Sequence, residues 1–334
     1  MCPRLCRMFR PAEARAEQGA AFDVAGSRAA SAPALPAESA GRRSGGAGIE
    51  SGAVEGFEAH RGHLWGVAYR ILGTTVDADD AVQETWLRWR QVDVREVDDE
   101  RAYLTMVVSR ICYDSLTSAR SRRETYVGEW LPEPVVKELG PDERVAMDDS
   151  VSLALLAVME RLSPAERTSL VLHDVFALPY EEISRILGRS VDAVRQLASR
   201  ARGRVQDYAP RRTSDRSAHL KVVEAFAAAA TTGDLPALVA VLDPEVVWRA
   251  DGGGVVTVAL VPVVGAMKVA RLLLGMVERW YVGMSAEFLE VNGAPGVVIR
   301  GADGGVDSVM AFTVADGRVT EIDVVRNPHK LRHV

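Results

Sequence analysis

Apolar residues recur at helical spacing after residue 53 and predict a helical module over residues 54–127. The first apolar stripe consists of Phe57, Leu64, Val67, Ala68, Ile71 and Leu72, and it favours one amphipathic helix. Gly73 follows at the position of a C-cap. A second helix begins in the acidic run at residues 77–80, because carboxylates suit a helix N-terminus. A third helix over residues 100–126 has its own apolar face and ends in a cluster of arginines.

Helical spacing returns over residues 150–208. Ser163, Pro164 and Glu166 give one helix of this stretch a capping box, with proline at its first position. The last two helices meet at a short turn, Gly188–Ser190. Two helices joined by such a turn form a helix-turn-helix, and glycine supplies the positive φ that the turn requires.

The last helix of this second stretch has two different faces. The face expected to pack against the preceding helix contains Val191, Val194, Leu197, Ala198 and Ala201. The opposite face carries Arg195, Gln196, Ser199, Arg200 and Arg202. Arginine can bond guanine, and glutamine can bond adenine, through two hydrogen bonds each. Phosphate contacts, which position a protein on DNA without specifying sequence, suit Arg189, Arg202 and Arg204.

Charge is distributed unevenly along the chain. The formal net charge is −6, yet residues 185–212 carry eight arginines and two aspartates. A basic segment in an acidic protein suits a contact with a polyanion such as DNA. The pattern therefore favours DNA binding, and a solvated basic helix of an ordinary bundle is the alternative.

From residue 214 the pattern changes to two helices followed by short apolar runs. These β-like runs cover residues 245–251, 255–261, 285–293, 295–301, 307–317 and 318–328. One further helix over residues 266–280 interrupts them, and turn dipeptides such as Asn292-Gly293 and Asp316-Gly317 punctuate them. Helices followed by a mostly antiparallel sheet predict an α+β domain over residues 214–334.

Two segments lack these patterns. Residues 1–53 are rich in Ala, Gly, Ser, Pro and Arg and have too few large apolar groups to offset the entropy of ordering, so a disordered tail is expected. Residues 128–149 contain three prolines and a net acidic balance, which predicts an extended linker. The chain is therefore expected to be multidomain, with two all-α modules followed by an α+β domain.

Cysteine usage and hydropathy bear on location. Cys2, Cys6 and Cys112 show no spacing typical of a zinc site or a disulfide framework, so a reducing compartment is expected. No run of about 18 apolar residues predicts a membrane span, and the first residues lack the apolar core of a secretory signal. These features predict a cytoplasmic protein with no membrane contact and no bound metal.

Two motifs carry a resemblance to a known family. Residues 77–90, DADDAVQETWLRWR, resemble region 2 of extracytoplasmic-function (ECF) sigma factors, and residues 162–202, which begin LSPAERTSLVLHDVF, resemble their region 4. The motifs occur in the family's order. The resemblance implies that residues 54–127 form region 2 and residues 150–208 form region 4. It also implies that the protein binds core RNA polymerase and directs it to promoter DNA, without an organic cofactor.

The resemblance implies roles for individual residues. In the region 2 motif, Asp80, Gln83 and Glu84 would bind the coiled coil of the polymerase β′ subunit, while region 4 would contact the β flap. The −10 element, where the family opens the duplex and captures a flipped base, would be met by Arg110, Asp114, Arg120, Arg122 and Arg123. The −35 element would be read by Arg195, Gln196, Ser199 and Arg200. Trp86 and Trp89 are expected to pack in the core or at its edge.

Three further motifs resemble a subgroup of these factors that carries a fused C-terminal domain of the SnoaL-like, NTF2-like fold. They are YVGEWLPEPV in the linker, DGGG at Asp251–Gly254 and NPHKL at Asn327–Leu331. We expect the last two to lie together near the linker, in a regulatory contact made by Trp130, Pro132, Asp251, Gly252, Gly253, Asn327 and Pro328. Val255 and His329 depart from the subgroup, which commonly has lysine and aspartate at these positions.

The C-terminal fold is also used by enzymes that hold a carboxylate or histidine within reach of a substrate proton. His219, Asp251 and Asp323 are the candidates, and they form no convincing acid–base pair. A regulatory domain without enzymatic activity is therefore favoured. The alternative is a DNA-binding module fused to a small-molecule-sensing or catalytic pocket. A generic helix-turn-helix repressor is a third interpretation, and it leaves the motif at residues 77–86 unexplained.

Overall fold

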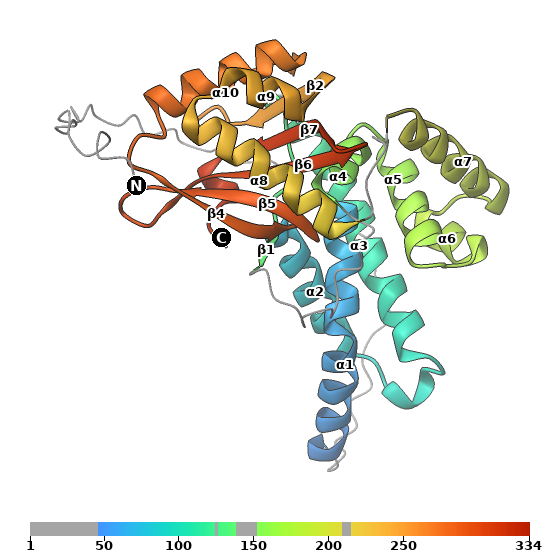
Figure 1. Ribbon diagram of the computed structural model, residues 1–334. Coiled ribbons are helices and arrows are strands. Elements are labelled where there is room, and N and C mark those ends of the chain that lie inside the picture. The colour runs from blue at the N-terminus through green and yellow to red at the C-terminus, as the bar shows by residue number, and fades with distance from the viewer. Residues whose placement is uncertain (1–45, 124–125, 138–151, 209–214) are drawn as a thin grey trace, which may run out of the picture.

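The structure is a computed structural model that describes residues 46–123, 126–137, 152–208 and 215–334. The first helical module consists of α1 (Gly46–Leu72), α2 (Thr75–Trp89), the short 3-10 helix η1 (Val94–Glu96) and α3 (Glu100–Arg123). These helices form the blue and blue-green lower part of Figure 1. α1 packs along both α2 and α3, and the apolar stripe predicted between Phe57 and Leu72 is buried.

The start of α1 corrects the predicted tail. The helix begins at Gly46, inside the segment that was expected to be disordered up to residue 53. Nucleating a helix fixes several residues for one hydrogen bond, whereas extending it gains one bond per added residue. The buried stripe that begins at Phe57 therefore supports a helix longer than its own apolar pattern. Residues 1–45 of the predicted tail lie outside the described residues.

The second helical module consists of α4 (Leu153–Met159), α5 (Pro164–Leu170), the π-helical segment η2 (Val171–Val175), α6 (Tyr180–Leu187) and α7 (Val191–Tyr208). The predicted capping box is present, because Ser163 and Glu166 each accept a bond from the other's backbone N–H. Gly188 joins α6 to α7 with a φ of +62°. The helix-turn-helix therefore has the turn that the sequence predicts.

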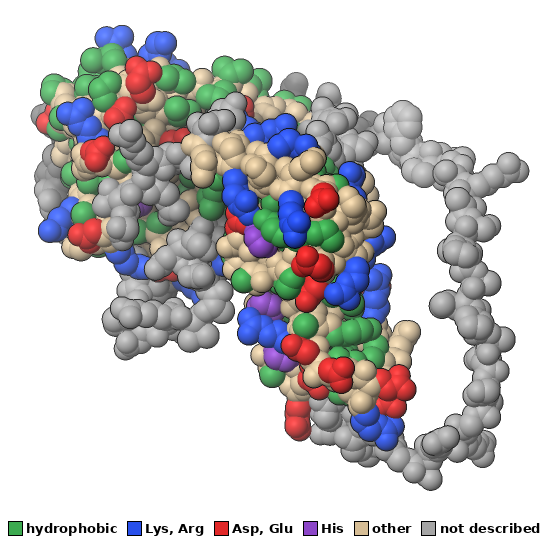
Figure 2. All heavy atoms as spheres, turned by 90° about the vertical axis from the view of Figure 1, so that its right-hand side faces the viewer, with side chains coloured by type: hydrophobic (Ala, Val, Ile, Leu, Met, Phe, Trp, Pro, Cys, Tyr) green, Lys and Arg blue, Asp and Glu red, His purple; other side chains and the backbone are tan. Residues whose placement is uncertain are grey.

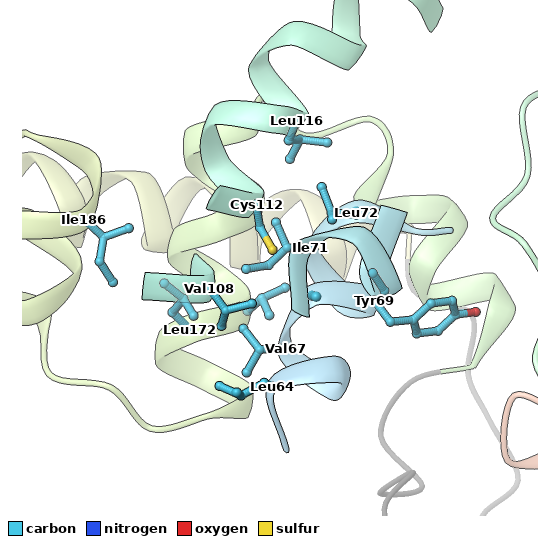
Figure 3. Packing of buried hydrophobic residues seen from close by; sticks show 14 of the residues in the cluster. Leu64, Val67, Tyr69, Ile71, Leu72, Val108, Cys112, Leu116, Leu172 and Ile186 are labelled. Atoms are coloured by element: carbon cyan, nitrogen blue, oxygen red, sulfur yellow. The ribbon is translucent and has the colours of Figure 1, made fainter. Parts of the chain in front are cut away.

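The two helical modules share one hydrophobic core. Figure 3 shows Val108 and Cys112 of α3 close to Ile71 of α1, and Leu172 and Ile186 of the second helical module belong to the same cluster. All five side chains are buried. Because burial of apolar surface is the main favourable term in such contacts, the two modules form one packed unit in this conformation.

The C-terminal domain places three helices on one face of a mixed sheet (Figure 1). Its elements are α8 (Arg216–Thr232), α9 (Leu235–Val241), β2 (Leu242–Asp251), β3 (Val263–Val264), α10 (Ala266–Arg279), β4 (Ser285–Val291), β5 (Ala294–Arg300), β6 (Val306–Ala315), β7 (Arg318–Val325) and the 3-10 helix η3 (Pro328–Lys330). The strand order is β1-β4-β5-β6-β7-β2-β3, with β1 (Val136–Lys137) supplied by the linker. β2 and β7 are parallel, and the other pairs are antiparallel. The predicted fold class, helical modules followed by an α+β domain, is confirmed.

One of the predicted strands is wrong. Residues 255–261 form a turn and a loop instead. Gly253 and Gly254 have φ values of +65° and +72°, which start a tight turn, and the N–H groups of Val255 and Val256 bond back to the carbonyl of Gly252. The backbone groups that a strand would pair with a neighbour are thereby partly satisfied within the turn.

The described part of the linker is built into the contact between the helical modules and the C-terminal domain. Residues 126–137 bend at Val127 and Gly128 and contain no helix, and β1 (Val136–Lys137) pairs antiparallel with β4. A separate hydrophobic cluster combines Leu131 of the linker, Leu153 of α4 and strand residues such as Val309. The face of the sheet opposite its helices is therefore covered by the linker and by the second helical module.

Candidate functional site

An acidic groove lies between α2 and α3 of the first helical module. Asp80 and Gln83 are exposed, while Glu84 is half-buried and pairs with Arg88 at 3.2 Å. These residues border a hollow of about 380 Å³ together with Leu87, whose side chain is 44% exposed. The structure therefore brings the three predicted polymerase-binding residues to one surface that is acidic with an apolar part.

The two tryptophans of α2 pack as predicted. Trp89 is 1% exposed and belongs to the shared core. Trp86 is half-buried, and its ring centre lies 5.1 Å from that of Phe57 in α1. Both rings fix α2 against its neighbours, which holds the acidic groove in place.

The residues predicted for the −10 element lie along α3. Arg110 and Asp114 are one turn apart and pair at 3.4 Å. Arg110 also reaches the second helical module, where its Nη1 donates a hydrogen bond to the carbonyl oxygen of Ile186 at 2.5 Å. The helix continues beyond them, but three of the predicted side chains lie outside the described atoms, namely those of Arg120, Arg122 and Arg123.

A second contact between the helical modules is centred on Phe176, which follows η2. Its ring meets His63 of α1 edge-on, with 5.3 Å between ring centres, and the Arg70 guanidinium lies 5.3 Å from its ring centre. Burial, and next the positive charges of Arg101, His60 and Arg70, together lower the pKa of His63 to about 4. His63 is therefore neutral at pH 7 within this contact.

The predicted −35 reading face of α7 is open to solvent. Arg195, Gln196, Ser199 and Arg200 are exposed, as is Arg189 in the preceding turn. Figure 2 faces the side on which α6 and α7 lie in Figure 1, and it shows Lys and Arg side chains mixed with Asp and Glu. The surface is therefore a patchwork of both charges rather than a uniformly basic face.

Acidic neighbours pair with two of these reading-face arginines. Arg195 lies 3.3 Å from Asp192, and Arg200 lies 3.6 Å from Glu166. The side chains of both arginines are more than half exposed, so these pairs contribute little to stability and can exchange for DNA contacts at low cost.

Arg202 is held differently from the reading-face arginines. Its guanidinium donates two hydrogen bonds to Asp174, at 2.6 and 2.7 Å, and one to the hydroxyl of Tyr180 at 2.9 Å. A bidentate pair of this kind is stronger than a single contact. The structure therefore gives Arg202 a role in joining α7 to η2 and α6, whereas the sequence had predicted a phosphate contact.

A buried carboxylate forms the centre of the contact between the linker and the C-terminal domain. Asp251, the last residue of β2, is 0% exposed. Its Oδ2 accepts hydrogen bonds from the Leu131 N–H at 2.9 Å and from Lys330 Nζ at 2.7 Å. Its Oδ1 accepts from the Tyr126 hydroxyl at 2.5 Å and from the Gly253 N–H at 3.0 Å. Four donors offset the cost of burying this charge.

Lys330 and Asn327 complete this contact. Lys330 Nζ also donates to the Leu131 carbonyl oxygen at 2.5 Å and lies 3.8 Å from the centre of the Trp130 ring. Asn327 Nδ2 donates to the Tyr126 hydroxyl at 2.9 Å. Burial, and next the hydrogen bond to Asp251, raise the pKa of Tyr126, which therefore stays protonated. We refer to this contact as the latch, which consists of Tyr126, Trp130, Leu131, Asp251, Asn327 and Lys330.

The structure brings most of the predicted interdomain residues to the latch. Pro132 is buried next to Leu131 in the linker, whereas Pro328 is exposed at the start of η3. Gly253 needs to be glycine, because a Cβ atom there would lie 2.5 Å from Cγ of Asn327 and because its φ is +65°. Gly252 is buried against the loop that follows it.

A second polar contact joins the same parts of the molecule, and the sequence did not predict it. Asn292 Nδ2 donates to the Tyr69 hydroxyl at 2.7 Å, and that hydroxyl donates to the Glu133 carbonyl oxygen at 2.6 Å. The Asn292 backbone and side chain also bond the Val135 backbone, at 2.9 and 3.1 Å. Tyr69, Glu133 and Asn292 are buried. Asn292-Gly293 had been predicted only as a hairpin turn, and its local sequence carries no sign of a partner in α1.

The acid–base candidates of the C-terminal domain are engaged in ion pairs or buried. Asp251 pairs with Lys330, and Asp323 pairs with Arg249 at 2.6 Å, while His219 is buried on α8. Among the described residues, no group of three His, Cys, Asp or Glu side chains could hold a metal ion. Within those same residues, no helix has the length and apolar content needed to cross a membrane.

Comparison with known proteins places these modules in a family. The model of sigma-70 region 2 matches residues 57–122, and that of sigma-70 region 4 matches residues 152–205. The ECF RNA polymerase sigma factor SigJ of Mycobacterium tuberculosis is 43% identical over 290 residues, which cover 83% of this chain and 92% of SigJ. The chain belongs to the ECF RNA polymerase sigma factors. The resemblance noted from its sequence is thereby confirmed.

Two further comparisons agree with this assignment to the ECF sigma factors. The probable ECF RNA polymerase sigma factor SigI of Mycobacterium tuberculosis is 36% identical over 280 residues, covering 82% of this chain and 93% of SigI. The crystal structure of Mycobacterium tuberculosis SigJ superposes with a TM-score of 0.69 at 40% identity, covering 83% of this chain and 97% of that one. The similarity to SigJ and SigI therefore extends beyond the two sigma-70 regions into the C-terminal domain.

Proposed function

We propose that this ECF sigma factor binds core RNA polymerase through the acidic groove of α2. Asp80, Gln83 and Glu84 would meet the coiled coil of the β′ subunit, and the second helical module would contact the β flap. Support comes from the chemistry of the groove, since exposed carboxylates beside an exposed leucine suit a partner helix that is basic and partly apolar. A cytoplasmic location follows from these proposed partners.

The proposed promoter contacts lie on α3 and α7. The −35 element would be read by Arg195, Gln196, Ser199 and Arg200, with Arg189 on a phosphate. The −10 element would be met by Arg110, Asp114, Arg120, Arg122 and Arg123. The exposure of the α7 face supports the first set. The bond between Arg110 and Ile186 means that Arg110 must first leave the second helical module.

The described conformation is proposed to be an inactive, closed state. The observation that carries this proposal is the direct contact of α3 with α6, through the Arg110–Ile186 bond and the shared core. Elements centred about 25 base pairs apart lie about 85 Å apart on straight B-DNA, at 3.4 Å per base pair. The recognition helix α7 has 18 residues and is only about 27 Å long at 1.5 Å per residue, so it spans a small part of the distance between the two elements. While α3 and the second helical module are in contact, they therefore lie too close together to occupy both elements at once. The two helical modules must separate on polymerase.

The C-terminal domain is proposed to be a non-catalytic regulator that favours this closed state. Its sheet buries apolar side chains against both the linker, at Leu131, and the second helical module, at Leu153. The latch and the Asn292–Tyr69 contact tie the same sheet to the linker and to α1. Because both carboxylate candidates hold buried ion pairs, catalysis by them is disfavoured. A small-molecule-sensing role for this domain is the second candidate function, and the cavity described below favours it.

In vitro transcription with purified core polymerase tests the proposal. Asp80→Lys should abolish binding to core enzyme and leave binding of the free protein to promoter DNA unchanged. Arg200→Glu should retain core binding but lose promoter-specific transcripts, because it reverses the charge of the reading face. Glu55→Lys and Arg61→Glu make matched charge changes at exposed positions of α1, outside both proposed surfaces. Both variants should support normal transcription. Normal transcription by Asp80→Lys and Arg200→Glu would contradict the proposed surfaces.

A further inference from the structure

A cavity of about 200 Å³ lies between α10 and the sheet of the C-terminal domain. Its lining includes Trp248, Leu272, Met276 and Val324, which are apolar, and Trp280, whose side chain is 46% exposed. An apolar cavity of about 150 Å³ in another protein stays dry and admits benzene. A cavity of this size and lining therefore suits a small apolar ring system.

Among the described residues that line the cavity, Arg326 is the only charged one, and it is already neutralised. Arg326 donates hydrogen bonds to both oxygens of Asp307, at 2.8 and 3.2 Å, and to the Thr257 carbonyl oxygen at 3.3 Å. Its charge is therefore balanced by a carboxylate, and an anionic ligand would gain little from it. Trp248 and Trp280 contribute indole rings to the lining, and Met276 contributes a polarisable thioether, which also favours aromatic rings. The chemistry favours a neutral, fused aromatic molecule.

The cavity and the latch lie on opposite sides of the sheet, at the ends of the same two strands, β2 and β7. Successive residues of a strand point to opposite faces of the sheet. Ala250 lines the cavity while the next residue, Asp251, holds the latch. Just after the end of β7, Arg326 lines the cavity while the next residue, Asn327, bonds Tyr126. The two strand ends are also tied to each other, because the Arg326 N–H donates to the Asp251 carbonyl oxygen at 2.8 Å.

The loop after β2 connects the cavity and the latch a second time. Val258 and Ala259 form part of the cavity wall. At its start the same loop places Gly253 against Asn327 of the latch, and farther along it packs Leu260 against Gly128 of the linker. A molecule that fills the cavity therefore packs against the residues that position the latch.

We propose that this cavity is a binding site for a neutral, fused aromatic molecule, and that its occupancy tightens the latch. The proposal rests on the regulatory role proposed above for the C-terminal domain. A ligand that binds one conformation stabilises it by mass action, and the cavity and the latch are formed together in the closed conformation. The ligand therefore holds the sigma factor closed and lowers transcription.

The binding step is tested with indole as the probe and the full chain as the target, by calorimetric titration. Ala259→Phe places a ring in the cavity from a loop position, where the fold tolerates it. Ala302→Phe is the matched control, because Ala302 is exposed in the turn that follows β5. We expect saturable binding to the wild type and to Ala302→Phe, and at least about tenfold weaker binding to Ala259→Phe, as for a pocket filled by a competing group. Indole-3-acetate should bind more weakly than indole. Absence of saturable indole binding, or equal binding to Ala259→Phe, would overturn the proposal.

The coupling step is tested by hydrogen exchange at the Leu131 N–H, which bonds Asp251 in the latch. Saturating indole should slow this exchange several-fold in the wild type and leave it unchanged in Ala259→Phe. Exchange that indole does not alter in the wild type would refute the coupling. Failure of the proposed function is distinguishable, because it would appear as absent transcription without indole, and neither the titration nor the exchange measurement depends on polymerase.

Discussion

Arg110 of α3 donates a hydrogen bond to the backbone carbonyl oxygen of Ile186 in α6, with an N···O distance of 2.5 Å. The bond joins a residue predicted for the −10 element to the helix that precedes the −35 recognition helix. In this closed state Arg110 bonds the second helical module, and in the open state the same arginine is proposed to contact DNA. Opening of the modules and promoter binding are therefore linked through one side chain.

Replacement of Arg110 should shift the balance between closed and open forms. Arg110→Ala removes one charge-assisted bond, which is worth about 1.5 kcal/mol, or roughly a tenfold change in the equilibrium. Fluorescence energy transfer between labels on α3 and α7 should report a larger open population in the free protein. Arg61→Ala is the control, because Arg61 is exposed and pairs within α1 with Glu58. An unchanged distance distribution in Arg110→Ala would show that this bond does not hold the modules together.

Asp251→Asn should loosen the C-terminal domain from the linker. The change leaves Lys330 buried without its partner carboxylate and turns one acceptor oxygen into a donor. Breaking a buried ion pair in this way costs about 3 kcal/mol. Chemical unfolding should report this loss, and proteolysis of the linker should become faster. Asp316→Asn is the matched control, since Asp316 is exposed in a turn at a positive φ of 50° that asparagine tolerates. Equal stability of the two variants would contradict the structural role of the latch.

Tyr69 and Asn292 should be energetically coupled although 223 positions separate them in the chain. Tyr69→Phe leaves the Asn292 amide and the Glu133 carbonyl without their buried partner, which costs about 1–3 kcal/mol. Asn292→Gly keeps the positive φ of 49° accessible and removes the same bond from the other side. In a double-mutant cycle the second change should therefore cost less than it does alone. Strictly additive effects would mean that the contact contributes nothing, and Tyr281→Phe, inside the C-terminal domain, provides the comparison.

Mild acid should weaken the contact between the helical modules through His63. Its folded pKa of about 4 lies below the usual 6.5, first because of burial and then because of Arg101, His60 and Arg70. The unfolded chain therefore binds a proton more readily, so stability from this group is complete above pH 6.5 and is lost as the pH falls toward 4. Unfolding free energies measured from pH 7.5 to 4.5 should decline less steeply in His63→Gln. His329→Gln, which replaces an exposed histidine of the C-terminal domain, is the comparison variant. The same slope in His63→Gln as in the wild type would exclude His63 as the source.

Local patterns predicted the elements, and chain-distant contacts escaped prediction for a physical reason. The stripe from Phe57 to Leu72 and the turn at Gly188 follow from helical periodicity and from the backbone freedom of glycine. The Arg110–Ile186 and Tyr69–Asn292 bonds join residues 76 and 223 positions apart, and neither has a signature in its neighbouring residues. The run 255–261 was predicted as a strand because its composition is that of a strand, whereas the glycines before it close a turn.

Some features of the candidate site could be predicted from the sequence, and others could not. The exposed face of α7 and the acidic residues of α2 follow from helical spacing together with the family motifs. The pairing of Arg202 with Asp174 could not be predicted, because it depends on how η2 lies against α7. Asp251 had been predicted for the interdomain contact and considered as an acid–base candidate, and its burial under Lys330 became evident only from the packed domains.

The distance between the helical modules tests the closed state most directly. Labels at Ser118→Cys on α3 and Gln206→Cys on α7, both exposed positions, would be introduced after replacement of Cys2 and Cys6 by serine. Pulsed dipolar spectroscopy should give one short distance in the free protein and a distance several tens of ångströms longer after core polymerase and promoter DNA are added. The same short distance in the free protein and in the transcribing complex would contradict the proposed opening.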